Sequence, residues 1–519
     1  MRIGVDVGGT NTDAVLLSGK TVLGAVKRPT SEDVSSGICE AISALISDCN
    51  ITPDAIDAVM IGTTHFTNAF VQRRELVPVY AIRIGFPAGR GIPPFSSWPE
   101  DLKKTIRGGS AMVRGGFEFD GREISPFDEA AIADCVKEAC NKGITQIAVS
   151  CIFSQLNSAH EQRAAELIGE LAPELEVSLS SELGRVGLLE RENAAIMNAS
   201  LRPLALKIAA AFKSALVDLG ISAPFFVSQN DGTLMGADHM QRYPVLTFAA
   251  GPTNSLRGAA WLTGADDAIV VDIGGTTSDI GVLVSSFPRQ STVHVDVGGV
   301  RTNFRMPDIL SIGLGGGSLI RNAEKGVSVG PDSVGYRLRE EALIFGGNTL
   351  TASDIAVAGG QAKFGDPGRV SGLPSDLLTD ARDAISSLLA DAIDRMKTAP
   401  GDIPMILVGG GSVLVSEKPQ GVSEMMCPEH AGVANAIGAA IGQVSGEIDR
   451  IYSLEDAPRR EAAIEDAKAQ AIAQAVAAGA SEGTVEVVNI ETVPLQYLPG
   501  GATRIVCRAV GDLAMEENE

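Results

Sequence analysis

The sequence predicts an α/β protein of two lobes, each built around its own glycine-rich β-hairpin. Two observations lead to this prediction: a segment that begins at Asp6 recurs at Asp272, and each copy lies between two short apolar runs. The chain has 519 residues, which is enough for about three or four domain-sized units. Its composition, 45% hydrophobic and 20% charged, is typical of a globular protein with a large core.

The repeated segment reads Asp-Val-Gly-Gly-Thr-Asn-Thr-Asp at residues 6–13 and Asp-Ile-Gly-Gly-Thr-Thr-Ser-Asp at residues 272–279. Each copy predicts a β-hairpin with a Gly-Gly-Thr turn, because apolar strands precede and follow it. The expected strands are residues 1–5, 14–17, 268–271 and 280–284. One such turn is weak evidence for a ligand site, whereas two in one chain are specific. A similar stretch at residues 295–299 lacks the threonine and the second aspartate, and it predicts an ordinary turn within an insertion.

The residue types in these turns suit a phosphate. Glycine lets the backbone approach a phosphate and direct N–H groups toward it, and threonine adds a hydroxyl donor. The candidate phosphate-binding residues are Gly8, Gly9, Thr10, Asn11, Gly274, Gly275, Thr276 and Thr277.

Carboxylates beside these turns suit Mg²⁺, which is bound through its water shell. Asp6 and Asp272 are therefore the candidate metal ligands and candidate catalytic residues. Asp13 and Asp279 are the next candidates, with hydrogen bonding to the turn backbone as the alternative role.

An apolar strand at residues 405–408 leads into Gly409, Gly410 and Gly411, where a flat adenine has room to lie against the backbone. Helices rich in small residues are expected at 251–260 and 431–440. Small side chains let two helices cross near the short end of the usual interaxial range of about 8–10 Å. The pair therefore predicts a hinge between the lobes.

The order hairpin, small-residue helix, hairpin, glycine-turn strand, small-residue helix resembles the phosphate-1, connect-1, phosphate-2, adenosine and connect-2 elements of actin-like ATPases, over residues 4 to about 446. Within that superfamily the chain resembles the hydantoinase A/5-oxoprolinase family, whose ATP-dependent enzymes act on cyclic amides. That family's pattern is matched at residues 6–13, 62–69, 191–199, 228–234, 251–252, 272–279 and 311–318.

The resemblance implies a two-lobed actin-like ATPase (ribonuclease H-like) fold with duplicated β-hairpin phosphate loops and a small C-terminal α+β extension. The expected division is lobe I at 1–262, lobe II at 263–430, and a hinge helix with the extension at 431–519. The extension is expected to hold a helix at 459–478 and strands at 485–493 and 503–510. It is shorter than in most family members, and residues 328–338 and 349–354 depart from the family pattern.

The resemblance also implies ATP and Mg²⁺ as cofactors and ring opening of a hydantoin, 5-oxoproline or lactam through phosphorylation of the amide carbonyl. On the substrate side, His65 is a candidate catalytic residue that follows an expected strand at 58–61. It either orients the carbonyl or carries a proton, or else it caps the next helix. Gly315 and Gly316 belong to a second glycine loop, which either touches phosphate or substrate or forms a tight turn. The polar group Arg191-Glu192-Asn193 is more typical of a satisfied structural network.

Related systems imply a second subunit as partner, and a homo-oligomer stays open. Two other functions fit the same hairpins: a small-molecule kinase of the sugar-kinase type, and a regulatory ATPase without a small-molecule substrate. The net charge of −22 argues against nucleic acid or an anionic membrane as the main partner. The N-terminus leads directly into a strand, and the seven cysteines show no CxxC spacing. A cytoplasmic location is therefore expected, and the five histidines show no zinc-site spacing.

Overall fold

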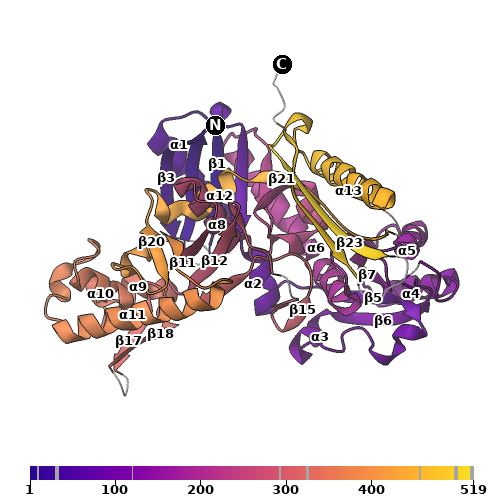
Figure 1. The fold of residues 1–519 in the computed structure, drawn as a ribbon, viewed down its shortest axis with the longest axis horizontal. Coiled ribbons are helices and arrows are strands. Elements are labelled where there is room, and N and C mark those ends of the chain that lie inside the picture. Colours follow the sequence, from indigo (N-terminus) through magenta and orange to yellow (C-terminus); the bar gives the residue numbers. More distant parts are fainter. Residues whose placement is uncertain are drawn as a thin grey trace.

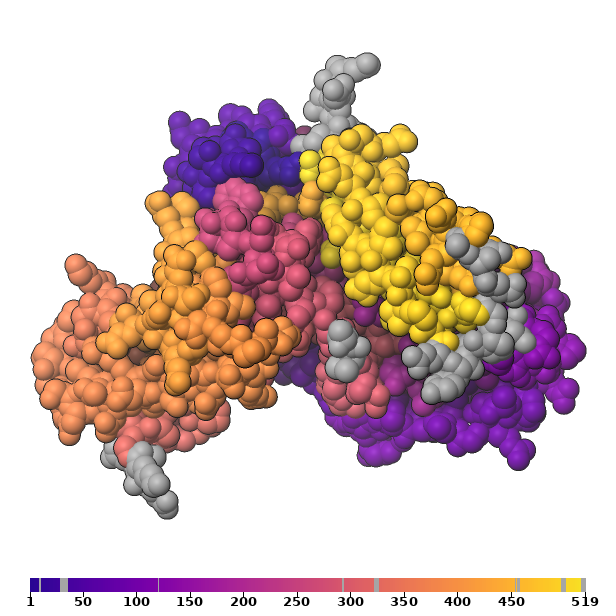
Figure 2. Space-filling model, viewed as in Figure 1, coloured from indigo at the N-terminus to yellow at the C-terminus, as the bar shows by residue number. Residues whose placement is uncertain are grey.

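The computed structural model describes residues 1–8, 11–29, 34–119, 121–291, 294–322, 326–454, 457–495 and 501–514. Two lobes flank a pair of crossed helices, α8 (Ala250–Thr263) and α12 (Ala434–Ala440). Lobe II is drawn mostly in orange on the left of Figure 1, and the purple insertion and yellow C-terminal elements lie on the right. The space-filling view shows the same two masses (Figure 2).

The sheet of lobe I contains the first and the last strand of the described residues. Among the described residues it has nine strands, in the order β22-β23-β21-β10-β9-β4-β1-β2-β3. Their bounds are β1 (Arg2–Val7), β2 (Asn11–Ser18), β3 (Thr21–Pro29), β4 (Ala58–Thr63), β9 (Phe225–Ser228), β10 (Thr233–Gly236), β21 (Gln443–Ser453), β22 (Glu486–Pro494) and β23 (Ala502–Gly511).

Alternation along β2 divides this sheet between two layers of helices. Leu16 packs with α1 (Val34–Cys49) and α6 (Leu188–Asp218), whereas Leu17 packs with α12 on the opposite face. Successive side chains of a strand point to opposite faces, so an apolar run such as that of β2 must be covered twice. The sheet is therefore a middle layer between helices.

The sheet of lobe II repeats this arrangement. In the described part of the chain it joins β13-β12-β11-β19-β20, with β16 paired to β12. Helix α8 covers one face, and α10 and α11 cover the other. The bounds are β11 (Ala268–Ile273), β12 (Ser278–Val284), β13 (Phe287–Pro288), β16 (Ile309–Ile312), β19 (Ile403–Val408), β20 (Val422–Met426), α10 (Ala352–Ala358) and α11 (Ser375–Met396).

An insertion in lobe I carries its own parallel sheet, β6-β5-β7-β8, packed against α4 and α5. The bounds are β5 (Val79–Phe86), β6 (Arg107–Arg114), β7 (Gln146–Cys151), β8 (Glu176–Leu179), α4 (Glu129–Asn141) and α5 (Ala159–Leu171). Helix α6 joins this unit to the main sheet. It is the one described helix long and apolar enough to cross a membrane, and 67% of its apolar window is buried inside the protein.

The shorter elements lie between these layers. The stretch at residues 295–299 forms strand β14 and the turn of a separate two-stranded hairpin, β14-β15. An ordinary turn was predicted here because the stretch lacks the threonine and the second aspartate of the repeated segment. The remaining bounds are α2 (His65–Gln72), α3 (Glu100–Ile106), α7 (Ala237–Arg242), α9 (Leu338–Glu341), β14 (Val295–Val297), β15 (Val300–Thr302), β17 (Ser318–Asn322) and β18 (Val327–Ser333).

Glycines set the close approach of α8 and α12. A Cβ added to Gly258 would lie 1.9 Å from the carbonyl oxygen of Ala434, and one added to Gly438 would lie 1.8 Å from that of Asn254. Both are closer than any real Cβ contact, so only glycine permits this crossing. The small residues of these two segments predicted such a crossing.

The C-terminal extension is a helix, α13 (Ala457–Ala477), laid over β21 and β23. Its buried face is made of alanines, among them Ala467 and Ala471. The predicted helix and strand pair are therefore present. The sequence analysis did not predict β21, whose pairing with β23 extends the main sheet of lobe I across the insertion (Figure 1).

Candidate active site

The two hairpins have the same backbone geometry. Asp6 lies opposite Asp13 in the β1–β2 register, and Asp272 lies opposite Asp279 in the β11–β12 register. The first turn is closed by Gly8 N–H donating to the Asn11 carbonyl at 3.0 Å, and the second by Gly274 N–H donating to that of Thr277 at 2.9 Å. Gly9 and Thr10 lie outside the described residues, whereas Gly275 is half-buried and Thr276 and Thr277 are exposed.

A glycine on the neighbouring parallel strand makes room for each carboxylate. Gly62 pairs with Asp6, and a Cβ on Gly62 would lie 2.4 Å from Asp6 Oδ1. In lobe II, Gly409 follows the residue paired with Asp272, and a Cβ there would lie 2.2 Å from Asp272 Oδ1. Asp6 and Asp272 are each the penultimate residue of a strand, so their carboxylates lie within the sheet edge.

The crossed helices supply the partners of these carboxylates. Asn435 Nδ2 donates to Asp6 Oδ2 at 2.9 Å and to Asp13 Oδ2 at 3.0 Å, and Ser255 Oγ donates to Asp272 Oδ2. Asp6 Oδ1 and the amide nitrogen of Asn254 both lie against the Cα of Gly62. Both atoms are buried, and neither makes a hydrogen bond of regular geometry among the described residues, although Asn254 lies close enough to lower the pKa of Asp6. One oxygen of Asp6 is therefore available to a cation.

Burial makes these acids weak. Burial, and next the charge of Asp13, raise the pKa of Asp6 from 3.8 to about 7, and the hydrogen bond from Asn435 opposes this shift. Burial raises the pKa of Asp272 to about 6 against the hydrogen bond from Ser255. Burial also raises the pKa of Asp13 and of Asp279. Such clustering of raised carboxyl pKa values is typical of sites that bind a cation or move a proton.

The second aspartate of each hairpin contacts side chains. Asp13 accepts from Lys27 and Asn435, and Asp279 accepts from Ser311. Hydrogen bonding to the turn backbone remains the alternative role of these two aspartates.

Lys27 is a functional candidate that the sequence analysis missed. It lies opposite Asp13 in the β2–β3 register, and its Nζ is 3.0 Å from Asp13 Oδ1. Although burial dominates the raised pKa of Asp272, the charge of Lys27 works against it. The lysine therefore lies close enough to influence both hairpins. The sequence signal for Lys27 was the alternation of side chains along β3, the strand that comes directly after the predicted hairpin.

The second glycine loop, residues 313–318, packs on the turn of the lobe II hairpin. Gly316 N–H donates to the Gly274 carbonyl at 3.0 Å, and Gly317 N–H donates to that of Gly275 at 2.7 Å. Gly315 N–H donates to Ser318 Oγ, and a Cβ on Gly315 would lie 2.6 Å from Thr276 N. These N–H groups are engaged within the protein, so the loop supports the turn.

The glycine turn after β19 lies beside the same hairpin. Gly409 N–H donates to the Ala431 carbonyl at 2.9 Å, and Gly411 N–H donates to that of Ile273 at 2.7 Å. Gly410 is exposed, and nothing lies within 4 Å of a Cβ built on it. This turn therefore offers an open backbone face at the edge of lobe II.

His65 begins α2 beside the first hairpin. Its Nδ1 is 2.8 Å from Thr63 Oγ1, and Thr63 pairs with Val7 at the end of β1. Thr64, rather than His65, occupies the N-cap position, and no side-chain capping bond is present there. Burial lowers the pKa of His65, so the ring is neutral at pH 7. Its polar edge faces the hairpin and does not cap the helix.

The polar group on α6 is a satisfied structural network, as its composition predicted. Glu192 is bonded by Arg83 and by Ser150, Arg191 donates to Ser180 and to the Cys151 carbonyl, and Asn193 accepts from Trp98. These contacts fasten the inserted β5–β8 sheet to lobe I.

Two family profiles match this chain. One, described as the hydantoinase/oxoprolinase N-terminal region, covers residues 2–172, and the other, described as hydantoinase/oxoprolinase, covers residues 191–393. The chain belongs to the hydantoinase/oxoprolinase family. The family resemblance inferred from the motifs is thereby confirmed.

Two curated relatives are identical to this family member at about a quarter of the aligned residues. The acetophenone carboxylase gamma subunit of Aromatoleum aromaticum is 27% identical over 391 residues, covering 68% of this chain and 52% of the relative. The caprolactamase subunit alpha of Pseudomonas jessenii is 26% identical over 380 residues, covering 69% of this chain and 54% of the relative. The chain thus matches about half the length of these relatives.

A solved structure supports the fold over the whole chain. The crystal structure of the ATP-dependent caprolactamase from Pseudomonas jessenii superposes with a TM-score of 0.79 at 19% identity, covering 99% of this chain and 88% of that one. The two-lobed α/β fold predicted from the sequence is confirmed. Within the described residues, no group of three or more His, Cys, Asp or Glu is placed to hold a metal ion.

Proposed function

We propose that this chain binds ATP with Mg²⁺ between its two hairpins and uses it to phosphorylate the carbonyl oxygen of a cyclic amide, so that the ring opens. The observation that carries the proposal is the duplicated geometry: each lobe presents the same turn, the same carboxylate position and the same glycine beside it. Membership of the hydantoinase/oxoprolinase family supports the choice of reaction.

The hairpins would hold the phosphates through backbone N–H groups and hydroxyls. Gly8, Gly9, Thr10 and Asn11 act from lobe I, and Gly274, Gly275, Thr276 and Thr277 act from lobe II. Lys27 neutralises phosphate charge beside Asp13. Gly315 and Gly316 support the second turn, and Gly409, Gly410 and Gly411 offer backbone to the nucleoside.

Asp6 and Asp272 fit a magnesium ion that keeps most of its water, because each hairpin contributes one carboxylate at this position and Asp6 Oδ1 makes no regular hydrogen bond among the described residues. Such an ion supplies charge neutralisation for phosphoryl transfer. Both carboxylates must ionise to bind it, which their raised pKa values resist. His65, neutral and bonded to Thr63, is positioned to meet the carbonyl group on the lobe I side.

The reaction balances without any further reagent. The imidic form of the amide attacks the γ-phosphorus, and the bond to the β-phosphate oxygen breaks to release ADP. Water then adds to the activated carbon, and cleavage of the C–N bond releases the amine and leaves an acyl phosphate. A second water hydrolyses the acyl phosphate to a carboxylate and inorganic phosphate. Phosphorylation is needed because resonance makes an unactivated amide a poor electrophile.

A second subunit is part of the proposal, because the names of both curated relatives call them subunits. Hydrolysis of the activated carbonyl would then take place with that partner present. We also place the reaction in the cytoplasm, where the absence of disulfides among the described cysteines is expected.

The test is release of inorganic phosphate from Mg-ATP, with a panel of hydantoins, 5-oxoproline, larger lactams and sugars, with and without the neighbouring encoded subunit. Stimulation by a cyclic amide, together with an opened acid, supports the proposal. Asp272→Asn should abolish it, and Asp332→Asn, on an exposed strand of the same lobe, should not. A stable phosphorylated sugar would show a kinase instead, and turnover unaffected by any small molecule would show a regulatory ATPase.

One relative favours a second substrate class. The acetophenone carboxylase gamma subunit acts, by its name, in carboxylation of a ketone. A ketone enol presents the same oxygen nucleophile to the γ-phosphate as an imidic acid. Acetophenone and acetone with bicarbonate therefore belong in the same panel, and phosphate release with them alone would move the assignment to ketone carboxylation.

A further inference from the structure

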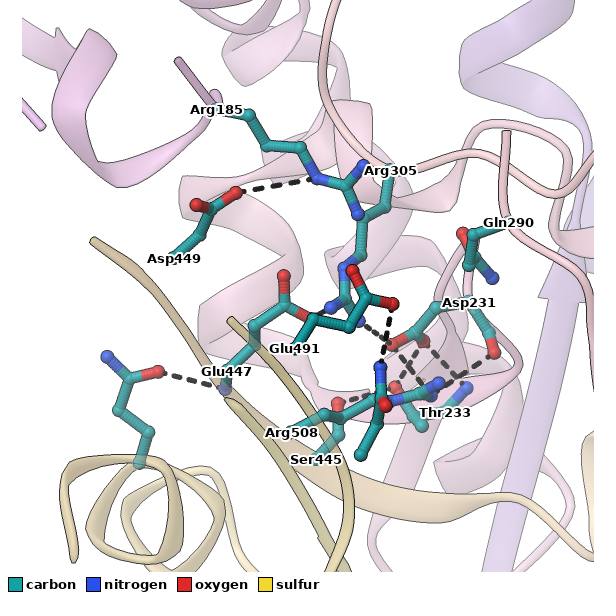
Figure 3. A network of polar contacts seen from close by, with 12 residues as sticks. Arg185, Asp231, Thr233, Gln290, Arg305, Ser445, Glu447, Asp449, Glu491 and Arg508 are labelled. Carbon is teal, nitrogen blue, oxygen red and sulfur yellow. Dashed lines mark hydrogen bonds and ion pairs between the residues drawn. The ribbon is translucent and has the colours of Figure 1, made fainter. Parts of the chain in front are cut away.

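A cavity of about 720 Å³ lies apart from the hairpins, among the β5–β8 insertion, the loop at residues 229–231, Phe304 and Arg305, strand β21 and the end of α13. None of the hairpin residues that we assign to ATP lines it. The family motif at residues 228–234 forms part of its wall, although that motif has no role in the nucleotide site described above. Figure 3 shows the polar side chains on one side of this cavity.

Charges of both signs line the cavity. Arg305 is ion-paired with Glu447 and lies 3.9 Å from Asp231. Arg185 lies 3.7 Å from Asp449 on β21. Asp231 is held in place from behind by Arg508, at 2.9 Å (Figure 3). Neither a simple anion nor a simple cation matches such a lining, because each would face like charges at short range.

Several hydrogen-bond donors on the same walls have no partner among the described residues. They are Ser154 Oγ, Asn230 Nδ2 and Arg305 Nε, whereas Arg185 Nε is the atom paired with Asp449. Ser154 and Asn230 are only 3% and 2% exposed, so these groups are far from bulk water. Burying a polar group without a hydrogen bond is costly, which makes an unpaired donor at a cavity wall a good indicator of a ligand acceptor.

We infer that this cavity binds a small zwitterion, a molecule with both a carboxylate and an ammonium group. The donors of Arg305, Asn230 and Ser154 bind the carboxylate. Glu447 of β21 binds the ammonium, whereas both oxygens of Asp449 are held by Arg504. Charge-assisted hydrogen bonds of this kind are about twice as strong as neutral ones.

The inference deepens the proposed function and rests on it for the ligand's origin. Opening a lactam ring converts a neutral amide into an amino acid, which is such a zwitterion. The cavity therefore suits the product of the reaction in preference to the cyclic amide from which it forms. Its volume exceeds what one small amino acid fills, so ordered water shares the site.

The cavity is also connected to the nucleotide carboxylates. The Asn230 carbonyl accepts from Thr253 Oγ1 at 3.0 Å, and the next two residues of α8, Asn254 and Ser255, face Asp6 and Asp272. Arg305 lies between β15 and β16, and β16 belongs to the lobe II sheet. Movement of the lobes therefore shifts one wall of the cavity relative to the others.

The test is calorimetric titration of the full chain, without nucleotide, with glutamate, 6-aminohexanoate, hexanoate and hexylamine. We expect at least one of the two amino acids to bind, and hexanoate and hexylamine to bind at least tenfold more weakly than 6-aminohexanoate if that is the ligand. Ala477→Tyr narrows the entrance from an exposed helical position and should weaken binding at least tenfold. Ala469→Tyr, also exposed and about 12 Å back along α13, is the matched control and should bind as the wild type does.

Arg305→Met tests the contact with the ligand carboxylate directly. If this substitution at a buried position unfolds the chain, Ala477→Tyr still tests the inference. Hexanoate binding as tightly as the amino acids would overturn the inference, as would undiminished binding by Ala477→Tyr or no amino acid binding at millimolar concentration. Since no turnover is measured, amino acid binding without any amide-stimulated phosphate release would remove the proposed function and leave the cavity assignment standing.

Discussion

At the scale of single residues, the carboxylates of Asp6, which is buried, and of Asp272, which is half-buried, dominate the chemistry. Both could be predicted from the sequence, because the same eight-residue pattern surrounds each of them. Their partners could not: Asn435 is remote from Asp6 along the chain, and no local pattern joins a helix amide to a strand carboxylate. The role of Gly62 could not be predicted either, because a side chain at this position would clash with Asp6 only once β1 and β4 pair.

Replacing Asp272 by Asn should remove the stabilisation that Mg-ATP gives, without destabilising the free protein. A ligand present at 100 times its Kd stabilises the folded state by about 2.7 kcal/mol, and this gain should vanish in the variant. The free protein should be at least as stable as the wild type, because the amide has no charge to bury. Thermal unfolding with and without Mg-ATP measures both, with Asp332→Asn as control. An undiminished gain in Asp272→Asn would refute the metal assignment.

The raised pKa of Asp6 gives stability a definite pH dependence. The folded state holds the proton up to about pH 7, whereas the unfolded state loses it near 3.8. The folded state therefore binds more protons in this window, and stability of the free protein falls as pH rises from about 4 to 7. Asp6→Asn should flatten that slope in urea unfolding measured at several pH values, and an unchanged slope would contradict the raised pKa.

The same acids predict proton release when the nucleotide binds. At pH 6.5 a cation between Asp6 and Asp272 must displace protons that the free site retains. Calorimetry of Mg-ATP binding in buffers of different ionisation enthalpy should show release of about one proton in total, most of it from Asp6. The release should decrease at pH 8.5, where both groups are already ionised. Equal release at the two pH values would argue against these carboxylates as the source.

At the scale of elements, the crossing of α8 and α12 determines the site, because it delivers Ser255 and Asn435 to opposite hairpins. The sequence predicted both helices, since runs of Ala and Gly leave little else to form the contact. It did not predict β21, in which Gly446 and alternating charges obscure the usual strand pattern. That strand becomes recognisable only through its ten-residue pairing with β23.

Gly438→Ala should be strongly destabilising. The new Cβ would lie 1.8 Å from the Asn254 carbonyl oxygen, and backbone cannot move aside as a side chain can. Overpacking of this kind costs about 1–3 kcal/mol or more. Gly432→Ala, six residues earlier with nothing within 4 Å of the added Cβ, is the matched control. Urea unfolding of both variants tests this prediction. Equal unfolding midpoints would mean that the two helices move apart without a loss of stability.

At the scale of the whole molecule, the β14–β15 hairpin packs Val297 and Val300 into the core of lobe I, and the lobes meet at further places besides the crossed helices. One is a stack in which Phe287 of lobe II lies 4.0 Å from the guanidinium of Arg257 and 5.1 Å from that of Arg508. The duplicated hairpins allowed the two-lobed layout to be predicted from the sequence. The cavity beside β21 could not be predicted, because its walls come from segments far apart in the chain.

Mg-ATP should draw the lobes together, since it contacts a hairpin in each and so favours the closed state. Small-angle X-ray scattering with a non-hydrolysable analogue should give a smaller radius of gyration than the free protein gives. Asp272→Asn should keep the free value under the same conditions. An identical radius with and without the analogue in the wild-type protein would mean that the nucleotide binds to an already closed molecule.

The joint between β10 and β21 has one more consequence. Only Thr233 and Leu234 pair with β21, whereas β21, β22 and β23 pair with one another along most of their length. A block so well bonded internally and so narrowly attached is expected to open as one cooperative unit before the rest of lobe I does. Its amide protons would then exchange with deuterium at a common rate, faster than those of β1 and β4. The last seventy or so residues would thus have a stability of their own, set by the ion pairs Asp231–Arg508, Arg305–Glu447 and Arg185–Asp449 and by the packing of Val444 and Ala475 against β4.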